Sequence, residues 1–218
     1  MSASFHANNV RFTIESPYYT SVSSGEKIDE LWLVLHGYGQ LAEFFLQKFE
    51  PLYQPNRVFV APQGIHRFYK EGFKGRVVAN WMTKVHRDED IQHCNQYLNA
   101  VLKDVLAQHP HVNSVNALGF SQGAATLSRW IAQNDRILDK AVFWGGAMAY
   151  DLEVRPFLDR TSNTQITFAI GEKDPLLTPE RLLEHKDFLH RKGISNIQEM
   201  SYPGSHEIDI ALMARLME

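Results

Sequence analysis

A serine between two glycines stands where an apolar segment changes to a helical pattern. Residues 115–127 read VNALGFSQGAATL, so that Gly119-Phe120-Ser121-Gln122-Gly123 follows the apolar run. A G-x-S-x-G sequence between a strand and a helix is typical of a nucleophile elbow, a turn so tight that the flanking side chains must be absent. Such a turn holds the serine hydroxyl clear of the sheet, at the positive end of a helix. The pattern indicates Ser121 as a nucleophile.

A serine hydroxyl is a poor nucleophile until a base takes its proton, and a carboxylate must orient that base. The expected strand 166–170 runs into Gly-Glu-Lys-Asp-Pro, which places Asp174 in the loop at its end. His206 stands in a later loop, after the next expected helix and strand. The chain order Ser121, Asp174, His206 is the order expected after a nucleophile elbow, so we expect these three side chains to form a catalytic triad.

Alternatives to two of these residues stay open. Glu172 and Asp159 are also acidic, and an acid before proline is often a turn or cap residue. His206 has nine rival histidines, although it alone stands in the loop predicted to follow the acid. Of the rivals, His36 is expected to support a neighbouring loop by hydrogen bonding rather than to carry a proton.

Acyl transfer also needs two N–H groups that bind the oxyanion of the tetrahedral intermediate. One should be the backbone N–H of Gln122, directly after the nucleophile. The second should come from the loop after an early strand, and the apolar run 31–35 ends in His-Gly-Tyr-Gly. Because glycines flank Tyr38, the backbone can turn its N–H inward, and we assign the second donor to Tyr38.

The remaining pattern predicts a single α/β domain over residues 1–218. Alternating apolar runs and amphipathic stretches favour a mainly parallel sheet with helices on both faces and no large cap domain. An antiparallel ribbon is expected at the N-terminal edge, from residues 10–14 and 18–22. The other expected strands are 31–35, 58–61, 112–118, 141–144, 166–170 and 197–202, and the expected helices are 88–107, 122–133, 179–191 and 208 to the C-terminus.

The segment 63–87 is rich in glycine and aromatic residues and has no clean periodicity. Phe73, Trp81 and Met82 in this segment are candidates to line an acyl groove beside Ser121. The alternative is that they pack as ordinary core and loop hydrophobic residues.

The sequences LVLHGYGQ, APQG, NWMT, GFSQGAA, GEKDP and YPGSHEI occur in this order and spacing. Together they resemble the phospholipase/carboxylesterase family of α/β-hydrolases, which includes acyl-protein thioesterases and small bacterial carboxylesterases. The resemblance runs from about residue 31 to the C-terminus. It implies an α/β-hydrolase fold and a cofactor-free serine hydrolase that acts on carboxylic esters or thioesters. The chain departs from the family at Tyr38 and Gln40, where leucine and aspartate are common, and at Ser205, where glycine is usual.

Composition argues against several other classes of protein. The net charge is −3, from 22 basic and 25 acidic residues that are mixed along the chain, so nucleic acid is not an expected partner. The single cysteine, Cys94, suits a reducing compartment, and no secretory signal or transmembrane stretch is seen, which predicts a cytoplasmic protein. No metal site is expected, because the histidines lack partners at ligand spacing.

The function predicted from these residues is hydrolysis of an ester, or of a thioester, through an acyl-enzyme on Ser121. A ligand-binding protein without turnover is the main alternative, and a peptidase is a weaker one. The sequence leaves open whether the substrate is a lipid, a small metabolite or an acylated protein, and whether the protein is a homodimer.

Overall fold

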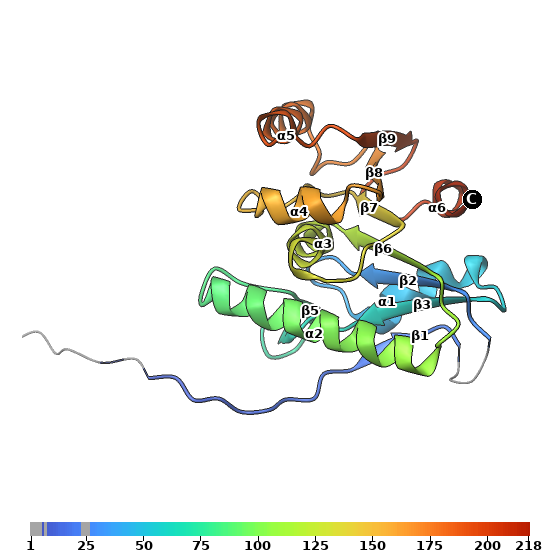
Figure 1. The fold of residues 1–218 in the computed structure, drawn as a ribbon. Helices are drawn as coiled ribbons and strands as arrows, with labels where there is room; N and C mark the ends of the chain where they lie inside the picture. Colours follow the sequence, from blue (N-terminus) through green and yellow to red (C-terminus); the bar gives the residue numbers. More distant parts are fainter. Residues whose placement is uncertain (1–5, 7, 23–26) are drawn as a thin grey trace, which may run out of the picture.

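The computed structural model describes residues 6, 8–22 and 27–218, and its centre is a seven-stranded sheet (Figure 1). The strand order is β1-β3-β2-β6-β7-β8-β9. Neighbouring strands are parallel except for β1, which is antiparallel to β3. The mainly parallel sheet with an antiparallel N-terminal edge is therefore confirmed. The strands are β1 (Tyr18–Thr20), β2 (Glu30–Leu35), β3 (Arg57–Pro62), β6 (Ser114–Phe120), β7 (Lys140–Trp144), β8 (Gln165–Gly171) and β9 (Ile197–Tyr202).

The expected ribbon between residues 10–14 and 18–22 does not form. Only β1 is a strand, and it pairs with β3, with Tyr18 opposite Pro62. Residues 10–14 alternate as a strand would, but they have no surface to pack against. The apolar side chains of Val10, Phe12 and Ile14 are 67–85% exposed.

Helices cover both faces of the sheet, as the sequence predicts (Figure 1). Alternate residues of β2 point to opposite faces, so that Leu33 packs in one core and Trp32 in the other. The first face is covered by α2 (Arg87–Gln108), α3 (Gln122–Gln133), α4 (Val154–Arg160) and α5 (Pro179–Arg191). The second face is covered by α1 (Ala42–Leu46), the 3₁₀ helix η1 (Gln47–Leu52) and α6 (Ile210–Met217). Among the described residues, none of these helices is long and apolar enough to span a membrane.

The elements that the sequence did not predict are short or lack periodicity. They are α1, η1, α4 and a hairpin formed by β4 (His66–Tyr69) and β5 (Val77–Asn80). The hairpin lies within the segment 63–87, and Phe68 stands opposite Val78 in its register. The last helix begins at Ile210 rather than at residue 208, because the Asp209 side chain caps it by accepting a hydrogen bond from Leu212 N–H at 2.7 Å.

Glycines in the G-F-S-Q-G sequence let α3 lie directly against the ends of β2 and β6. A Cβ atom on Gly123 would lie 2.3 Å from the carbonyl oxygen of Leu35 in β2. A Cβ atom on Gly119 would lie 2.4 Å from the carbonyl oxygen of Gly123 in α3. Both obstructing atoms are backbone atoms, which cannot rotate away. Even a methyl group at either position would therefore push the helix off the sheet.

We expect Gly123→Ala to lower the free energy of unfolding by about 1–3 kcal/mol, because the added methyl group overpacks this contact. Helix propensity alone predicts the opposite change, a stabilisation of about 1 kcal/mol. Urea unfolding followed by circular dichroism measures the sign. A stabilised variant would contradict the close approach of α3 to β2.

Candidate active site

Ser121 lies in a strained turn between β6 and α3. Its φ and ψ are 55° and −116°, values that non-glycine residues rarely adopt. The turn is held on both sides, since Ser121 N–H donates to the Trp144 carbonyl at 2.9 Å and the Ser121 carbonyl accepts from Ala124 N–H at 3.0 Å. This geometry agrees with the tight turn that the G-F-S-Q-G sequence predicts.

Asp174 and His206 are in contact at the same edge of the sheet as this turn. His206 Nδ1 lies 2.6 Å from Asp174 Oδ2. The Asp174 side chain is fully buried, and its other oxygen accepts from Leu176 N–H at 2.8 Å. Both carboxylate oxygens are therefore occupied, which fixes the orientation of the carboxylate and, through it, of the imidazole ring.

The His206 ring packs against the residue that precedes the serine. Its centroid lies 4.7 Å from that of the Phe120 ring, and a Cβ atom on Gly145 would lie 3.3 Å from the imidazole. The ring is thus held between the end of β6 and the end of β7. Nε2 has no hydrogen-bond partner among the described residues.

The two alternative acids lie elsewhere. Glu172 accepts a hydrogen bond from the Ser201 hydroxyl at 3.2 Å. Asp159, at the end of α4, forms an exposed ion pair with Arg155 at 3.3 Å. Neither contacts His206, so of the three candidate acids the structure brings only Asp174 to the histidine.

The loop after β2 runs against the serine turn and carries an unpaired N–H group. A Cβ atom on Gly37 would lie 3.1 Å from Ser121 Cβ. The Gln40 side chain holds the loop by accepting from Gly37 N–H at 2.8 Å. Tyr38 N–H and Gln122 N–H have no acceptor among the described residues. These are the two donors that the sequence assigns to the oxyanion.

His36 supports this loop by hydrogen bonding, as expected. Its side chain is buried, and Nε2 accepts from Gly64 N–H at 3.0 Å. Nδ1 therefore carries the proton and donates to the Gly37 carbonyl at 2.8 Å. Burial lowers the pKa of His36 to about 4, so the ring is neutral near pH 7 and does not compete as a base.

The Gln122 side chain connects the Ser121 turn to the end of β5. Its Oε1 accepts from Trp81 N–H at 3.2 Å, and its Nε2 donates to the Met82 carbonyl at 3.2 Å. The Trp81 indole in turn donates to the His36 carbonyl at 2.7 Å. The sequence did not predict this network, and the position of Gln122 next to Ser121 was its only signal.

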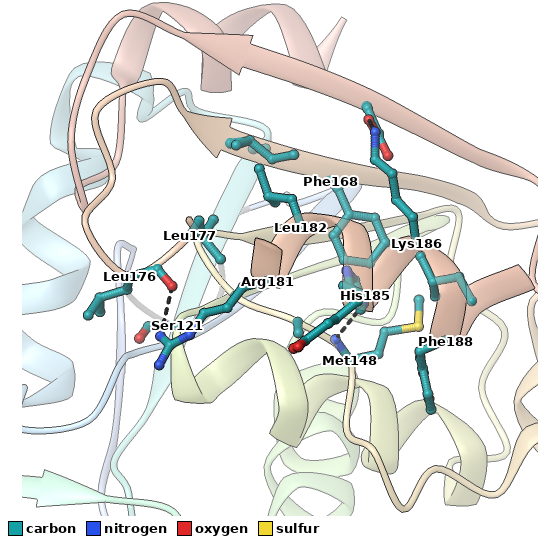
Figure 2. Close-up of a pocket in the computed structure, with 18 of the residues that line it drawn as sticks. Ser121, Met148, Phe168, Leu176, Leu177, Arg181, Leu182, His185, Lys186 and Phe188 are labelled. Atoms are coloured by element: carbon teal, nitrogen blue, oxygen red, sulfur yellow. Dashed lines mark hydrogen bonds and ion pairs between the residues drawn. The ribbon is translucent and has the colours of Figure 1, made fainter. Parts of the chain in front are cut away.

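A cavity of about 410 Å³ begins at Ser121 and extends beneath α5 (Figure 2). Its wall is largely apolar and comes from the loop after β7, from β8, from the segment 176–189 and from β9. The apolar side chains are Ala147, Met148, Phe168, Ala169, Ile170, Leu176, Leu177, Leu182, Phe188 and Leu189, and the charged or titratable ones are Tyr150, Arg181, Glu184, His185, Lys186 and Glu199.

The residues expected to line an acyl groove do not line this cavity. Phe73 is 99% exposed in the loop of the β4–β5 hairpin, which directs it away from the core. Trp81 is fully buried and serves in the network with Gln122 and His36. Met82 lies beside Trp81, where its carbonyl accepts from Gln122. The amphipathic pattern of residues 179–191 was the signal for the lining of this cavity, because the apolar face of that helix must cover the sheet.

Two polar contacts fix the far wall of the cavity. His185 is half-buried between the rings of Phe168 and Phe188, and its Nε2 accepts from Met148 N–H at 3.3 Å. Burial lowers the pKa of His185, which favours this neutral form. Lys186 pairs with Glu199 at 2.8 Å. The part of the chain that the structure describes has no cluster of three or more His, Cys, Asp or Glu side chains arranged to hold a metal ion.

The family model described as serine hydrolase (FSH1) matches residues 29–208, which is most of the 218-residue chain. The chain belongs to the serine hydrolase (FSH1) family. The match includes Ser121, Asp174 and His206, as well as the Tyr38 loop. No curated protein sequence matches the chain.

Solved structures of esterases share the fold of this FSH1 serine hydrolase. A carboxylesterase from Mesorhizobium loti superposes with a TM-score of 0.71 at 18% identity, over 93% of this chain and 94% of that one. Acyl-protein thioesterase 2 from Zea mays superposes with a TM-score of 0.66 at 20% identity, over 93% and 96% of the two chains. A phospholipase/carboxylesterase from Dyadobacter fermentans gives 0.62 at 18% identity, over 95% and 98%. These similarities show the α/β-hydrolase fold that the sequence resemblance implies.

We expect His36 to make the FSH1 serine hydrolase less stable in acid. Because its pKa is about 4 in the folded state and about 6.5 when unfolded, the unfolded chain binds the proton first as pH falls. The free energy of unfolding should therefore decrease by about 2 kcal/mol between pH 7 and pH 5 through this group. Urea unfolding at each pH measures the change.

In His36→Gln this part of the pH dependence should disappear, while the exposed His190→Gln should keep it. His185, whose pKa is also lowered by burial, acts equally in all three proteins. Equal slopes in the wild type and His36→Gln would contradict the neutral, buried state of His36.

Proposed function

We propose that this chain hydrolyses carboxylic esters through an acyl-enzyme on Ser121, with His206 as the base and Asp174 as the acid of a triad. The observation that carries the proposal is the 2.6 Å contact between His206 Nδ1 and Asp174 Oδ2, with the ring packed on Phe120 beside the strained serine. The serine hydrolase family supports the same chemistry.

The first step forms the acyl-enzyme. His206 Nε2 takes the proton of the Ser121 hydroxyl while Oγ attacks the ester carbonyl carbon. The oxyanion of the tetrahedral intermediate accepts hydrogen bonds from the N–H groups of Tyr38 and Gln122. As the intermediate collapses, the bond to the leaving oxygen breaks, and the leaving alcohol takes the proton from Nε2.

Water then resolves the acyl-enzyme by the reverse sequence. His206 Nε2 takes a proton from water, the resulting hydroxide oxygen attacks the acyl carbon, and Ser121 Oγ leaves with the proton. Throughout, the Asp174 carboxylate keeps the proton of the neutral imidazole on Nδ1 and stabilises the imidazolium that forms in each step.

The acyl group is proposed to occupy the apolar cavity beneath α5. Its volume of about 410 Å³ falls within the range of about 300–1,000 Å³ typical of small-molecule sites. Ser121 lies at one end of it, and the wall beyond is formed by Leu177, Leu182 and Phe168. Thioesters fit the same mechanism, since only the leaving atom differs, and one of the similar structures is an acyl-protein thioesterase.

We expect Ser121→Ala to lose several orders of magnitude in kcat on p-nitrophenyl butyrate without unfolding, because it removes the nucleophile. Asp174→Asn should lose about 10⁴-fold, because an amide favours the wrong imidazole tautomer. Stopped assays of p-nitrophenol release measure both.

Glu172→Gln is the matched control for Asp174→Asn, and we expect this control variant to keep the wild-type activity. A fluorophosphonate probe should label wild-type Ser121 and leave Ser121→Ala unlabelled. Normal turnover in Ser121→Ala would overturn the mechanism. A folded wild type that neither reacts with the probe nor hydrolyses any ester would instead favour a ligand-binding protein.

We expect Leu182→Trp to shorten the acyl chains that the enzyme accepts, because the larger ring fills the cavity. Its kcat/KM for p-nitrophenyl octanoate should fall at least tenfold relative to that for the acetate, since each excluded methylene forfeits about 0.8 kcal/mol of apolar burial. A p-nitrophenyl series from acetate to palmitate measures the profile.

Leu183→Trp, one residue further along α5, is the matched control. Leu183 is 61% exposed and does not line the cavity, so its profile should match that of the wild type. An unchanged profile in Leu182→Trp would place the acyl group outside this cavity.

A further inference from the structure

One cation of the cavity wall is directed toward the nucleophile. Arg181 belongs to the first turn of α5, where its backbone N–H is capped by the Thr178 hydroxyl at 3.4 Å. Its side chain and Ser121 line the same cavity. Figure 2 shows Arg181 reaching from the helix toward the Ser121 end of the cavity, beside Leu176.

Most donors of this guanidinium are unused. A guanidinium has five N–H bonds, and the described residues provide one acceptor, the Leu176 carbonyl at 2.9 Å from Nη1. No carboxylate of the described residues lies within ion-pair distance of it. By contrast, Lys186 on the same helix is paired with Glu199, and Arg129 is paired with Asp151 at 2.8 Å.

No acidic group of the described residues forms an ion pair with Arg181. Asp174 is occupied by His206 and by Leu176 N–H. Glu199 is paired with Lys186. Glu184, one turn further along α5, lines the cavity but forms no ion pair with Arg181. The Ser121 end of a largely apolar cavity therefore contains an arginine with free donors in the fork geometry that matches a carboxylate.

We propose that Arg181 binds a carboxylate of the substrate, and that the enzyme prefers esters with a carboxylate a few atoms from the scissile carbonyl. This inference rests on the proposed ester hydrolysis at Ser121. The carboxylate comes from the acyl group, as in a dicarboxylic acid half-ester, or from the leaving alcohol. In either position it forms a charge-assisted hydrogen bond with the free N–H groups of Arg181.

A structural role for Arg181 predicts a different result. The bond to the Leu176 carbonyl connects Arg181 to the loop that carries Asp174. If that were its whole function, its loss would disturb the acid and lower kcat equally for every ester. Substrate selectivity, rather than activity alone, is therefore the informative readout.

The test compares matched charged and neutral esters. In the acyl arm, the p-nitrophenyl monoester of glutaric acid is compared with its neutral methyl ester. In the leaving-group arm, 4-carboxyphenyl butyrate is compared with 4-(methoxycarbonyl)phenyl butyrate. The proteins are the wild type, Arg181→Gln, Arg181→Lys and Arg191→Gln. Arg191 is an exposed residue at the end of α5 and is not part of the cavity, so its variant makes the same charge change elsewhere.

We expect Arg181→Gln to lower the charged-to-neutral ratio of kcat/KM by about tenfold or more in one arm, as loss of a charge-assisted hydrogen bond predicts. The responding arm identifies the part of the substrate that carries the carboxylate. Arg181→Lys should recover part of the ratio, and Arg191→Gln should leave it unchanged.

An unchanged ratio in both arms, or an equal loss on charged and neutral esters, would overturn the proposal and leave ester hydrolysis standing. If the folded wild type hydrolyses none of the four esters in a Ser121-dependent reaction, the proposed function itself fails. The two failures are thus distinguishable in one set of assays.

Discussion

The site depends on the contact between the start of α3 and the ends of β2 and β6. Because Gly123 lies against the Leu35 carbonyl, the chain must reverse within one residue, and that residue is Ser121 at a positive φ. Such a conformation costs about 1–3 kcal/mol in a non-glycine residue and persists only where the surroundings determine it. Here the hydrogen bond to the Trp144 carbonyl and the first turn of α3 hold it.

A buried polar network extends this constraint to the loop after β2, which carries the proposed oxyanion donor Tyr38 N–H. The Gln122 side chain bonds to the backbone of Trp81 and Met82, and the Trp81 indole bonds to the His36 carbonyl, so that the ends of β2 and β5 are joined to the start of α3. Each bond satisfies a group that would otherwise be buried without a partner, which makes the network costly to disturb. The backbone N–H groups of Tyr38 and Gln122 have no acceptor among the described residues. Rigid placement of such donors is what acyl-transfer chemistry requires.

The sequence predicted those strands and helices whose own residue pattern sets their conformation. Among the described residues, the six parallel strands were found because most of them are continuous apolar runs, and the four longest helices were found because their amphipathic pattern is clear. The N-terminal ribbon, α1, α4 and the β4–β5 hairpin were missed or misplaced, since short elements take their conformation from packing rather than from their own pattern. The positions of Phe73, which is exposed, and Trp81, which is buried, were also not predicted. An aromatic side chain in an irregular segment can either pack in the core or remain exposed, and periodicity does not distinguish the two.

The sequence by itself determined the serine turn, the candidate acid and base, and the edge of the sheet at which they meet, because parallel strands deliver their following loops to one edge. Only the tertiary structure decided which carboxylate reaches His206, where the cavity lies and which charges face it. Those features arise where α5, β8 and the loop after β7 pack together. Contacts between distant segments depend on the distances and orientations of packed elements, and no pattern within one segment records them.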